Sequence, residues 1–115
     1  MILPPPPESL RDLKKQLVLK DAAAWIAENK PFILDVRPLH FFMQGHLPQA
    51  VNIPLFALQS RLNELPKNQS ILTVCSHGNS SYSAMEFLLK NDFKKVLSLK
   101  SGVDGWKEAG FSVEH

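Results

Sequence analysis

The sequence lacks several features, and each absence narrows the class of protein. A single cysteine, Cys75, excludes a disulfide within the chain of 115 residues and fits a reducing cytoplasm. No apolar run approaches the roughly 20 residues that span a membrane, and the N-terminus lacks the charged and apolar regions of a secretory signal. The net charge of +2 is small and the basic residues are scattered, which argues against nucleic acid as a partner. These absences indicate a cytoplasmic protein that binds neither a membrane nor nucleic acid.

What the sequence does contain is an alternation of apolar runs and helical patterns. Short apolar runs typical of buried strands occur at residues 32–36, 50–53, 71–74 and 96–99, and a short edge strand is expected at 17–18. Helical patterns lie at residues 20–29, 38–44, 55–65, 83–90 and 102–110. The alternation predicts one α/β domain, residues 17–115, around a central, mostly parallel sheet. Residues 1–16 are expected to form a proline-rich N-terminal tail or arm.

The cysteine lies where a predicted strand meets a predicted helix. The residues between the two elements are small or polar, and they are Ser76, His77, Gly78, Asn79, Ser80 and Ser81. Such a loop presents backbone N–H groups at a helix N-terminus, and these groups stabilise a thiolate. We expect the six loop amides and the hydroxyls of Ser80 and Ser81 to hold the Cys75 thiolate without a paired cation. The alternative is that Cys75 is a small buried apolar residue at a strand end.

Residue spacing separates the possible chemistries of this thiol. A cysteine phosphatase needs an arginine six residues after the cysteine to hold phosphate with two hydrogen bonds, and that position is Ser81. Cys75, His77, His46 and His40 lack the paired spacing of a zinc site, so no metal site is predicted. A Cys–His pair of the protease type, formed with His46 or His77, stays open, although no third residue to orient the histidine can be identified.

Four segments, in order, resemble the signatures of the single-domain rhodaneses, the thiosulfate sulfurtransferases, over residues 17–113. The segments are Leu34–Arg37, Gly45–Pro54, Cys75–Ser81 and Ser101–Trp106. The loop Cys-Ser-His-Gly-Asn-Ser-Ser is similar to that of small bacterial thiosulfate sulfurtransferases, which work without the arginine found late in the loop of many relatives. The resemblance implies a single rhodanese-like domain with a five-stranded sheet flanked by helices on both faces.

The resemblance also implies a two-step transfer of sulfur. The Cys75 thiolate would take the outer sulfur of thiosulfate, or of another persulfide donor, and the loop amides would cradle the resulting persulfide. Cyanide, or a thiol such as that of reduced thioredoxin, would accept the sulfur, and no metal or organic cofactor would be needed. The alternative is a rhodanese-fold sulfur carrier or protein-binding module with little thiosulfate activity. We expect a monomer or a weak homodimer.

Three residues outside the loop are expected to support it. Asp35 ends an apolar strand, where its carboxylate needs hydrogen bonds from nearby backbone or from Arg37. Arg37 is the best candidate for a cation that faces the substrate, but a surface salt bridge is the favoured expectation for its side chain. Relatives usually carry an acidic residue where Phe41 stands, so Arg37 lacks that partner here. His46 is expected to pin its own loop, whereas His77, inside the cradle, is expected to affect the substrate or the acceptor.

Overall fold

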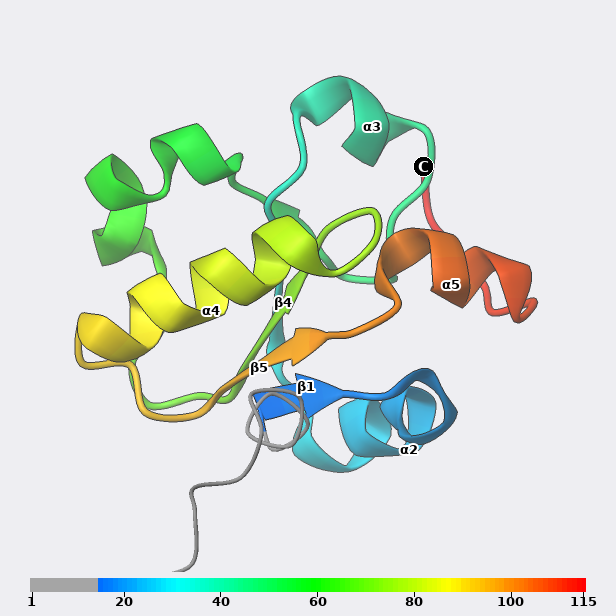
Figure 1. The fold of residues 1–115 in the computed structure, drawn as a ribbon, viewed down its shortest axis with the longest axis horizontal. Coiled ribbons are helices and arrows are strands. Elements are labelled where there is room, and N and C mark those ends of the chain that lie inside the picture. Colours follow the sequence, from blue (N-terminus) through cyan, green and yellow to red (C-terminus); the bar gives the residue numbers. More distant parts are fainter. Residues whose placement is uncertain (1–14) are drawn as a thin grey trace, which may run out of the picture.

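The computed structural model describes residues 15–115, and the predictions for residues 1–14 lie outside this range. One five-stranded sheet has the order β1-β5-β4-β2-β3, and each of its strand pairs is parallel (Figure 1). The strands are Gln16–Leu17 (β1), Phe32–Asp35 (β2), Val51–Asn52 (β3), Ile71–Val74 (β4) and Val96–Leu99 (β5). The predicted α/β fold is confirmed, and the edge strand β1 begins one residue before its predicted place.

Helices cover both faces of the sheet. The α-helices are Leu19–Asn29 (α2), Leu39–Met43 (α3), Asn79–Lys90 (α4) and Gly102–Glu108 (α5), and the 3-10 helices are Leu55–Ala57 (η1) and Gln59–Glu64 (η2). Helix α4 lies on one side of the sheet and α2 on the other (Figure 1). Among the helices of residues 15–115, none has the length and apolar character needed to cross a membrane.

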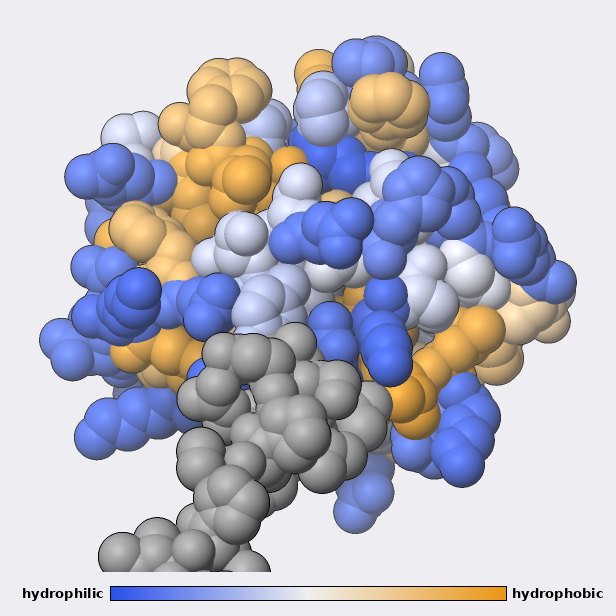
Figure 2. All heavy atoms as spheres, viewed as in Figure 1, coloured by the Kyte–Doolittle hydropathy of each residue, from blue (hydrophilic) through white to orange (hydrophobic). Residues whose placement is uncertain are grey.

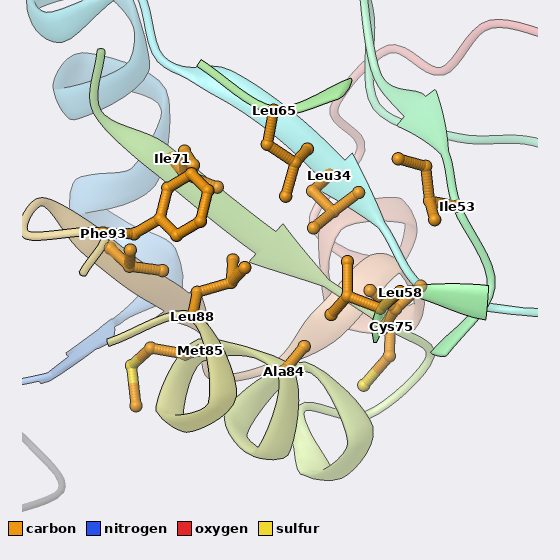
Figure 3. Packing of buried hydrophobic residues seen from close by; sticks show 12 residues of the cluster. Leu34, Ile53, Leu58, Leu65, Ile71, Cys75, Ala84, Met85, Leu88 and Phe93 are labelled. Carbon is orange, nitrogen blue, oxygen red and sulfur yellow. The ribbon is translucent and has the colours of Figure 1, made fainter. Parts of the chain in front are cut away.

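Two apolar cores form, one against each face of the sheet. Leu34 of β2 packs in the core that includes Met85 of α4 (Figure 3). Its neighbour Ile33 belongs to the other core, together with Ala22 of α2 and Trp106 of α5. Successive residues of a strand point to opposite faces, so a strand buried on both faces needs an unbroken apolar run. Each fully buried leucine or isoleucine contributes about 1.5–3 kcal/mol relative to an exposed one.

The segment 55–65 differs from its prediction as one helix with a stripe of leucines. It forms two 3-10 helices, and Arg61 has non-helical φ and ψ angles of −119° and 18°. The leucines are spaced three, four and three residues apart. A 3-10 helix aligns residues that are three apart, so each half of the segment suits such a turn and the kink takes up the extra residue. Leu58 is buried, whereas Leu55 and Phe56 are 39% and 87% exposed. An apolar area lies over the two 3-10 helices, at the upper left of Figure 2.

The carboxyl ends of β2 and β4 lie side by side, with Asp35 in register with Val74. The backbone N–H of Val36 donates to the carbonyl of Val74 at 3.0 Å, so the pairing continues one residue past β2. Ligands of parallel α/β sheets bind beyond this edge. The turn after β2 and the loop after β4, which begins with Cys75, therefore meet at the place where a ligand is expected.

Candidate active site

The sulfur of Cys75 points toward the first turn of α4 (Figure 3). The backbone N–H groups of Gly78 and Ser81 donate to Sγ at 3.1 and 3.3 Å, and the Ser81 hydroxyl oxygen lies 3.4 Å from Sγ. Cys75 is only 5% exposed. Of the six amides expected to hold the thiolate, the structure thus places two against the sulfur. No lysine or arginine takes part in these contacts among residues 15–115.

The loop turns its N–H groups inward because its carbonyls bond outward to α5. The carbonyl of Cys75 accepts from the N–H of Val103 at 2.8 Å, and that of Ser76 accepts from the N–H of Asp104 at 3.1 Å. Both donors lie in the first turn of α5, where backbone N–H groups have no partner within the helix. Helix α5 therefore fixes the orientation of the peptide groups that precede Gly78.

Two glycines allow the loop and the start of α5 to approach each other. A Cβ on Gly78, whose φ is +101°, would lie 2.1 Å from the carbonyl oxygen of Lys100. A Cβ on Gly102, whose φ is +66°, would lie 2.3 Å from the carbonyl oxygen of Ser76. Both conformations favour glycine, and both distances are shorter than any ordinary contact. The loop keeps its shape only while both positions carry no side chain.

Replacing Gly102 with alanine should destabilise the protein and disturb the thiol. We expect Gly102→Ala to lower the free energy of unfolding by about 2–3 kcal/mol, through backbone strain and overpacking against the loop. Urea unfolding measures this loss, and the alkylation rate of Cys75 reports the loop. Gly110→Ala is the matched control, because Gly110 has a φ of +86° with open space around it. It should cost only about 1 kcal/mol and leave the thiol unchanged, and equal effects in the two variants would contradict this account.

A pocket of about 200 Å³ opens in front of Cys75. It is lined by Val36, Arg37, Pro38, Phe41, Cys75, Ser76, His77, Asn79 and Ser80. The lining joins the cysteine loop to the turn after β2, as expected from the meeting of the two strand ends. A larger hollow of about 760 Å³ lies beside α2 and is lined in part by Trp106 and Phe111. That hollow contains neither Cys75 nor any other loop residue, so the chemistry is assigned to the smaller pocket.

Asp35 and Arg37 form a buried ion pair beside the pocket. The Arg37 Nη2 lies 2.7 Å from Asp35 Oδ2, and Asp35 also accepts from the Arg37 Nε and backbone N–H at 3.0 Å. The two residues are 0% and 5% exposed, so the ion pair is buried. The prediction of a surface salt bridge for Arg37 is therefore wrong. Arg37 folds back over the strand end, where Asp35 is its acidic partner and the carbonyl of Gly45 accepts from Nη2 at 2.9 Å. Asp35 thus offsets the charge that Arg37 brings to the pocket.

His46 occupies a structural position away from the pocket. Its Nδ1 lies 2.9 Å from the carbonyl oxygen of Phe42, and its ring stacks on that of Phe42 with centroids 3.7 Å apart. Its backbone exchanges two hydrogen bonds of 2.9 Å with Glu114. These contacts pin the loop after α3, as predicted. His46 is not among the residues that line the pocket, so it is not placed to pair with Cys75.

His77 points away from the sulfur, contrary to the expectation that its side chain lies inside the cradle. The side chain is 72% exposed, and Nε2 lies 2.8 Å from Asp104 Oδ2. The loop turns its N–H groups toward Sγ, and the side chain of residue 77 consequently faces solvent at the pocket mouth. Among residues 15–115, no group of three or more His, Cys, Asp or Glu side chains could hold a metal ion.

Sequence reasoning missed two residues that contact this loop. Asp104 holds His77, and Ser98 lies 2.8 Å from the hydroxyl of Ser81. Asp104 lies in the segment Ser101–Trp106, which resembles a family signature, but it was given no role of its own, because an acidic residue in the first turn of a helix is favourable on electrostatic grounds alone. Ser98 offered one signal, because a polar residue interrupts the apolar run of β5, and the structure gives it 0% exposure.

Comparison with known proteins places these observations in a family. A model of the rhodanese-like domain matches residues 18–109. The thiosulfate sulfurtransferase GlpE of Actinobacillus pleuropneumoniae is 31% identical over 93 residues, covering 79% of this chain and 86% of that protein. The putative sulfur carrier protein YrkF of Bacillus subtilis is 38% identical over 74 residues, covering 64% of this chain and 40% of that protein. A rhodanese-related protein from Thermoplasma volcanium has a crystal structure that matches with a TM-score of 0.76 and 27% identity, covering 87% and 97% of the two chains.

Proposed function

The chain belongs to the rhodanese-like domain family, and on that basis we propose that it transfers sulfur through a persulfide on Cys75. The observation that carries the proposal is the environment of the thiol. A cysteine with two backbone N–H groups directed at its sulfur and a serine hydroxyl 3.4 Å from it, at the inner end of a small pocket, is suited to carry negative charge as a thiolate and as a persulfide. A cysteine that served only packing would not need these donors.

The first step forms the persulfide. The Cys75 thiolate attacks the outer sulfur of thiosulfate, a new S–S bond forms, and the old S–S bond breaks. Sulfite leaves with the electron pair, and the outer sulfur keeps the negative charge on the enzyme. Ser76, His77, Asn79 and Ser80 line the pocket in front of Cys75, so we assign the loop from 76 to 81 the role of binding this outer sulfur.

The second step returns the thiolate. Cyanide, or the thiolate of an acceptor such as thioredoxin, attacks the outer sulfur, and the bond to Cys75 breaks with its electron pair on Sγ. Asp35, Arg37 and His46 act by holding the walls of the pocket. Neither step calls for a metal or an organic cofactor. We further propose that the domain, which includes Gln16 of β1 and not only residues 17–115, acts as the functional unit, as a monomer or weak homodimer in the cytoplasm, with the preceding residues as a tail.

A second candidate follows from the charges around the pocket. Thiosulfate is a dianion, yet Arg37 is paired with Asp35, and His77 is paired with Asp104. No unpaired cation is therefore present among the residues that line the pocket. This balance favours a donor of lower charge, such as the persulfide of a partner protein, and the match to a putative sulfur carrier supports the same view.

Donor choice separates the two candidates. Purified protein is supplied with thiosulfate or with glutathione persulfide, and thiocyanate is measured with cyanide as the acceptor. Saturable turnover with thiosulfate supports the first candidate, and turnover with the persulfide alone supports the second. Failure with both donors, in folded and reduced protein, would overturn the proposal.

Asp104→Asn sharpens this test, because it removes a negative charge near the mouth and keeps the backbone N–H that binds Ser76. We expect kcat/KM for thiosulfate to rise about two- to fivefold at low salt and the gain to disappear at high salt. Glu86→Gln provides a control for the change in net charge, since Glu86 is an exposed residue of α4 outside the pocket lining. An equal gain in both variants would argue against a local effect of Asp104.

A further inference from the structure

Three hydroxyl groups lie in the protein interior behind Cys75. Thr73 of β4, Ser81 of α4 and Ser98 of β5 are each 0% exposed. A hydroxyl removed from water costs free energy unless it finds a partner, so each of these groups should have a specific contact. The proposed reaction gives a direct role to Ser81 alone, which leaves the presence of Ser98 unexplained.

Ser98 connects to the sulfur through Ser81. The two serine oxygens lie 2.8 Å apart, and the Ser81 oxygen lies 3.4 Å from Cys75 Sγ. The backbone N–H of Ser81 also donates to Sγ at 3.3 Å, so the position of residue 81 is tied to the sulfur at two atoms. A continuous line of polar contacts thus runs from the centre of β5 to the thiol.

Thr73 provides a comparison within the same cluster. It is in register with Ser98 on the neighbouring strand, and its hydroxyl donates to the backbone carbonyl of Ser81 at 2.8 Å. Thr73 therefore holds the helix backbone, whereas Ser98 contacts the side-chain hydroxyl that faces the sulfur. The Ser98 hydroxyl is thus hydrogen-bonded to the Ser81 hydroxyl.

We propose that Ser98 is a positioning residue that sets the direction of the Ser81 hydroxyl toward the Cys75 thiolate. In the thiol state, S–H donates to Ser81 Oγ, and the Ser81 O–H turns toward Ser98. When the thiol loses its proton to solvent through the pocket, the Ser81 O–H turns to the sulfur, and the Ser98 O–H turns to Ser81. Neither serine loses a proton. Two linked hydrogen bonds then stabilise the thiolate more than one, because each polarises the other.

The same arrangement serves the persulfide, in which Sγ is bonded to the outer sulfur and has no proton to donate. Ser81 can then only donate to Sγ, and Ser98 keeps it in that direction. This inference rests on the proposed function only in taking Cys75 as the nucleophile. Its test uses alkylation of the thiol, which needs no sulfur donor. A failure of the inference about Ser98 is therefore distinguishable from a failure of the proposed sulfur transfer.

Ser98→Ala is the decisive variant, and the single cysteine of the chain makes alkylation by iodoacetamide specific. The rate is measured from acidic to alkaline pH, and its midpoint reports ionisation of Cys75. We expect the midpoint to rise by about half to one pH unit, which slows alkylation about three- to tenfold below the midpoint. The alkaline plateau should not fall, because a less stabilised thiolate is at least as nucleophilic. A midpoint equal to that of the wild type would overturn the proposal.

Three further variants separate positioning from packing. Thr73→Val removes an equally buried hydroxyl from the adjacent strand and should lower stability without moving the midpoint. Ser98→Thr keeps the hydroxyl and should retain the wild-type midpoint, which also decides the matter if Ser98→Ala does not fold. In a Ser81→Ala background, Ser98→Ala should cause no further shift, because the link to the sulfur is already gone. A shift in Thr73→Val as large as that in Ser98→Ala, a shifted midpoint in Ser98→Thr, or an additional shift in the double variant would each contradict the proposal.

Discussion

Cys75→Ser is expected to abolish sulfur transfer and to leave the fold intact. A serine hydroxyl is not ionised near neutral pH and cannot form a persulfide, so we expect a loss on the order of 10⁴-fold or more, as for other enzymes that lose their nucleophile. Serine differs from cysteine by one atom, and the N–H groups of Gly78 and Ser81 that donate to Sγ can donate to its oxygen instead.

Thiocyanate formation measures the activity of this variant, and circular dichroism with urea unfolding measures its fold. Ser83→Ala is a suitable control, because Ser83 is an exposed residue of α4, close to the loop in sequence, that lies outside the pocket lining. It should keep wild-type activity. Activity of Cys75→Ser within tenfold of the wild type would exclude a persulfide on this residue.

Asp35→Ala is expected to have the largest effect on stability. Its removal leaves the Arg37 guanidinium, whose residue is 5% exposed, without a counter-charge and with the carbonyl of Gly45 as a remaining partner at 2.9 Å. Breaking a buried ion pair in this way costs about 3–5 kcal/mol. Urea unfolding should show the loss as a lower midpoint. Asp35→Asn keeps a hydrogen-bond acceptor, so its unfolding midpoint should lie between those of the wild type and Asp35→Ala.

Glu64→Ala is the matched control for this ion pair. Glu64 pairs with Arg61 at 2.7 Å, a distance like that of the buried pair, but both side chains are exposed. The hydrogen bond from Arg61 lowers the pKa of the Glu64 carboxyl, and solvent screens this pair. We expect no measurable change in stability. Similar losses in Asp35→Ala and Glu64→Ala would contradict the importance of burial.

The central strands could be predicted from the sequence because burial on both faces imposes a pattern. The run 32–36 is almost wholly apolar since Ile33 and Leu34 enter different cores. The cysteine loop could be predicted for a related reason, because Gly78 and its polar neighbours interrupt the regular patterns between a strand and a helix. The expected contact of Asp35 with Arg37 followed from the cost of an unpaired carboxylate at the end of a buried strand.

Other features depend on contacts between distant segments, which local patterns do not reveal. The direction of His77 is set by Asp104, twenty-seven residues later in the chain, and the role of Gly102 is set by the carbonyls of the cysteine loop. The burial of Arg37 depends on how its side chain folds back over β2. The kink at Arg61 depends on a spacing of leucines that fits both an α-helix and two 3-10 turns.

Intact mass spectrometry after incubation with thiosulfate detects a persulfide on Cys75 directly. Reduced, folded protein is incubated with thiosulfate and then separated from the unreacted thiosulfate. Its intact mass is measured before and after addition of cyanide. We expect a mass gain of one sulfur atom, the loss of that sulfur on addition of cyanide, and no gain in Cys75→Ser. No gain with thiosulfate or with glutathione persulfide, or a gain that persists in Cys75→Ser, would contradict transfer through a persulfide on Cys75.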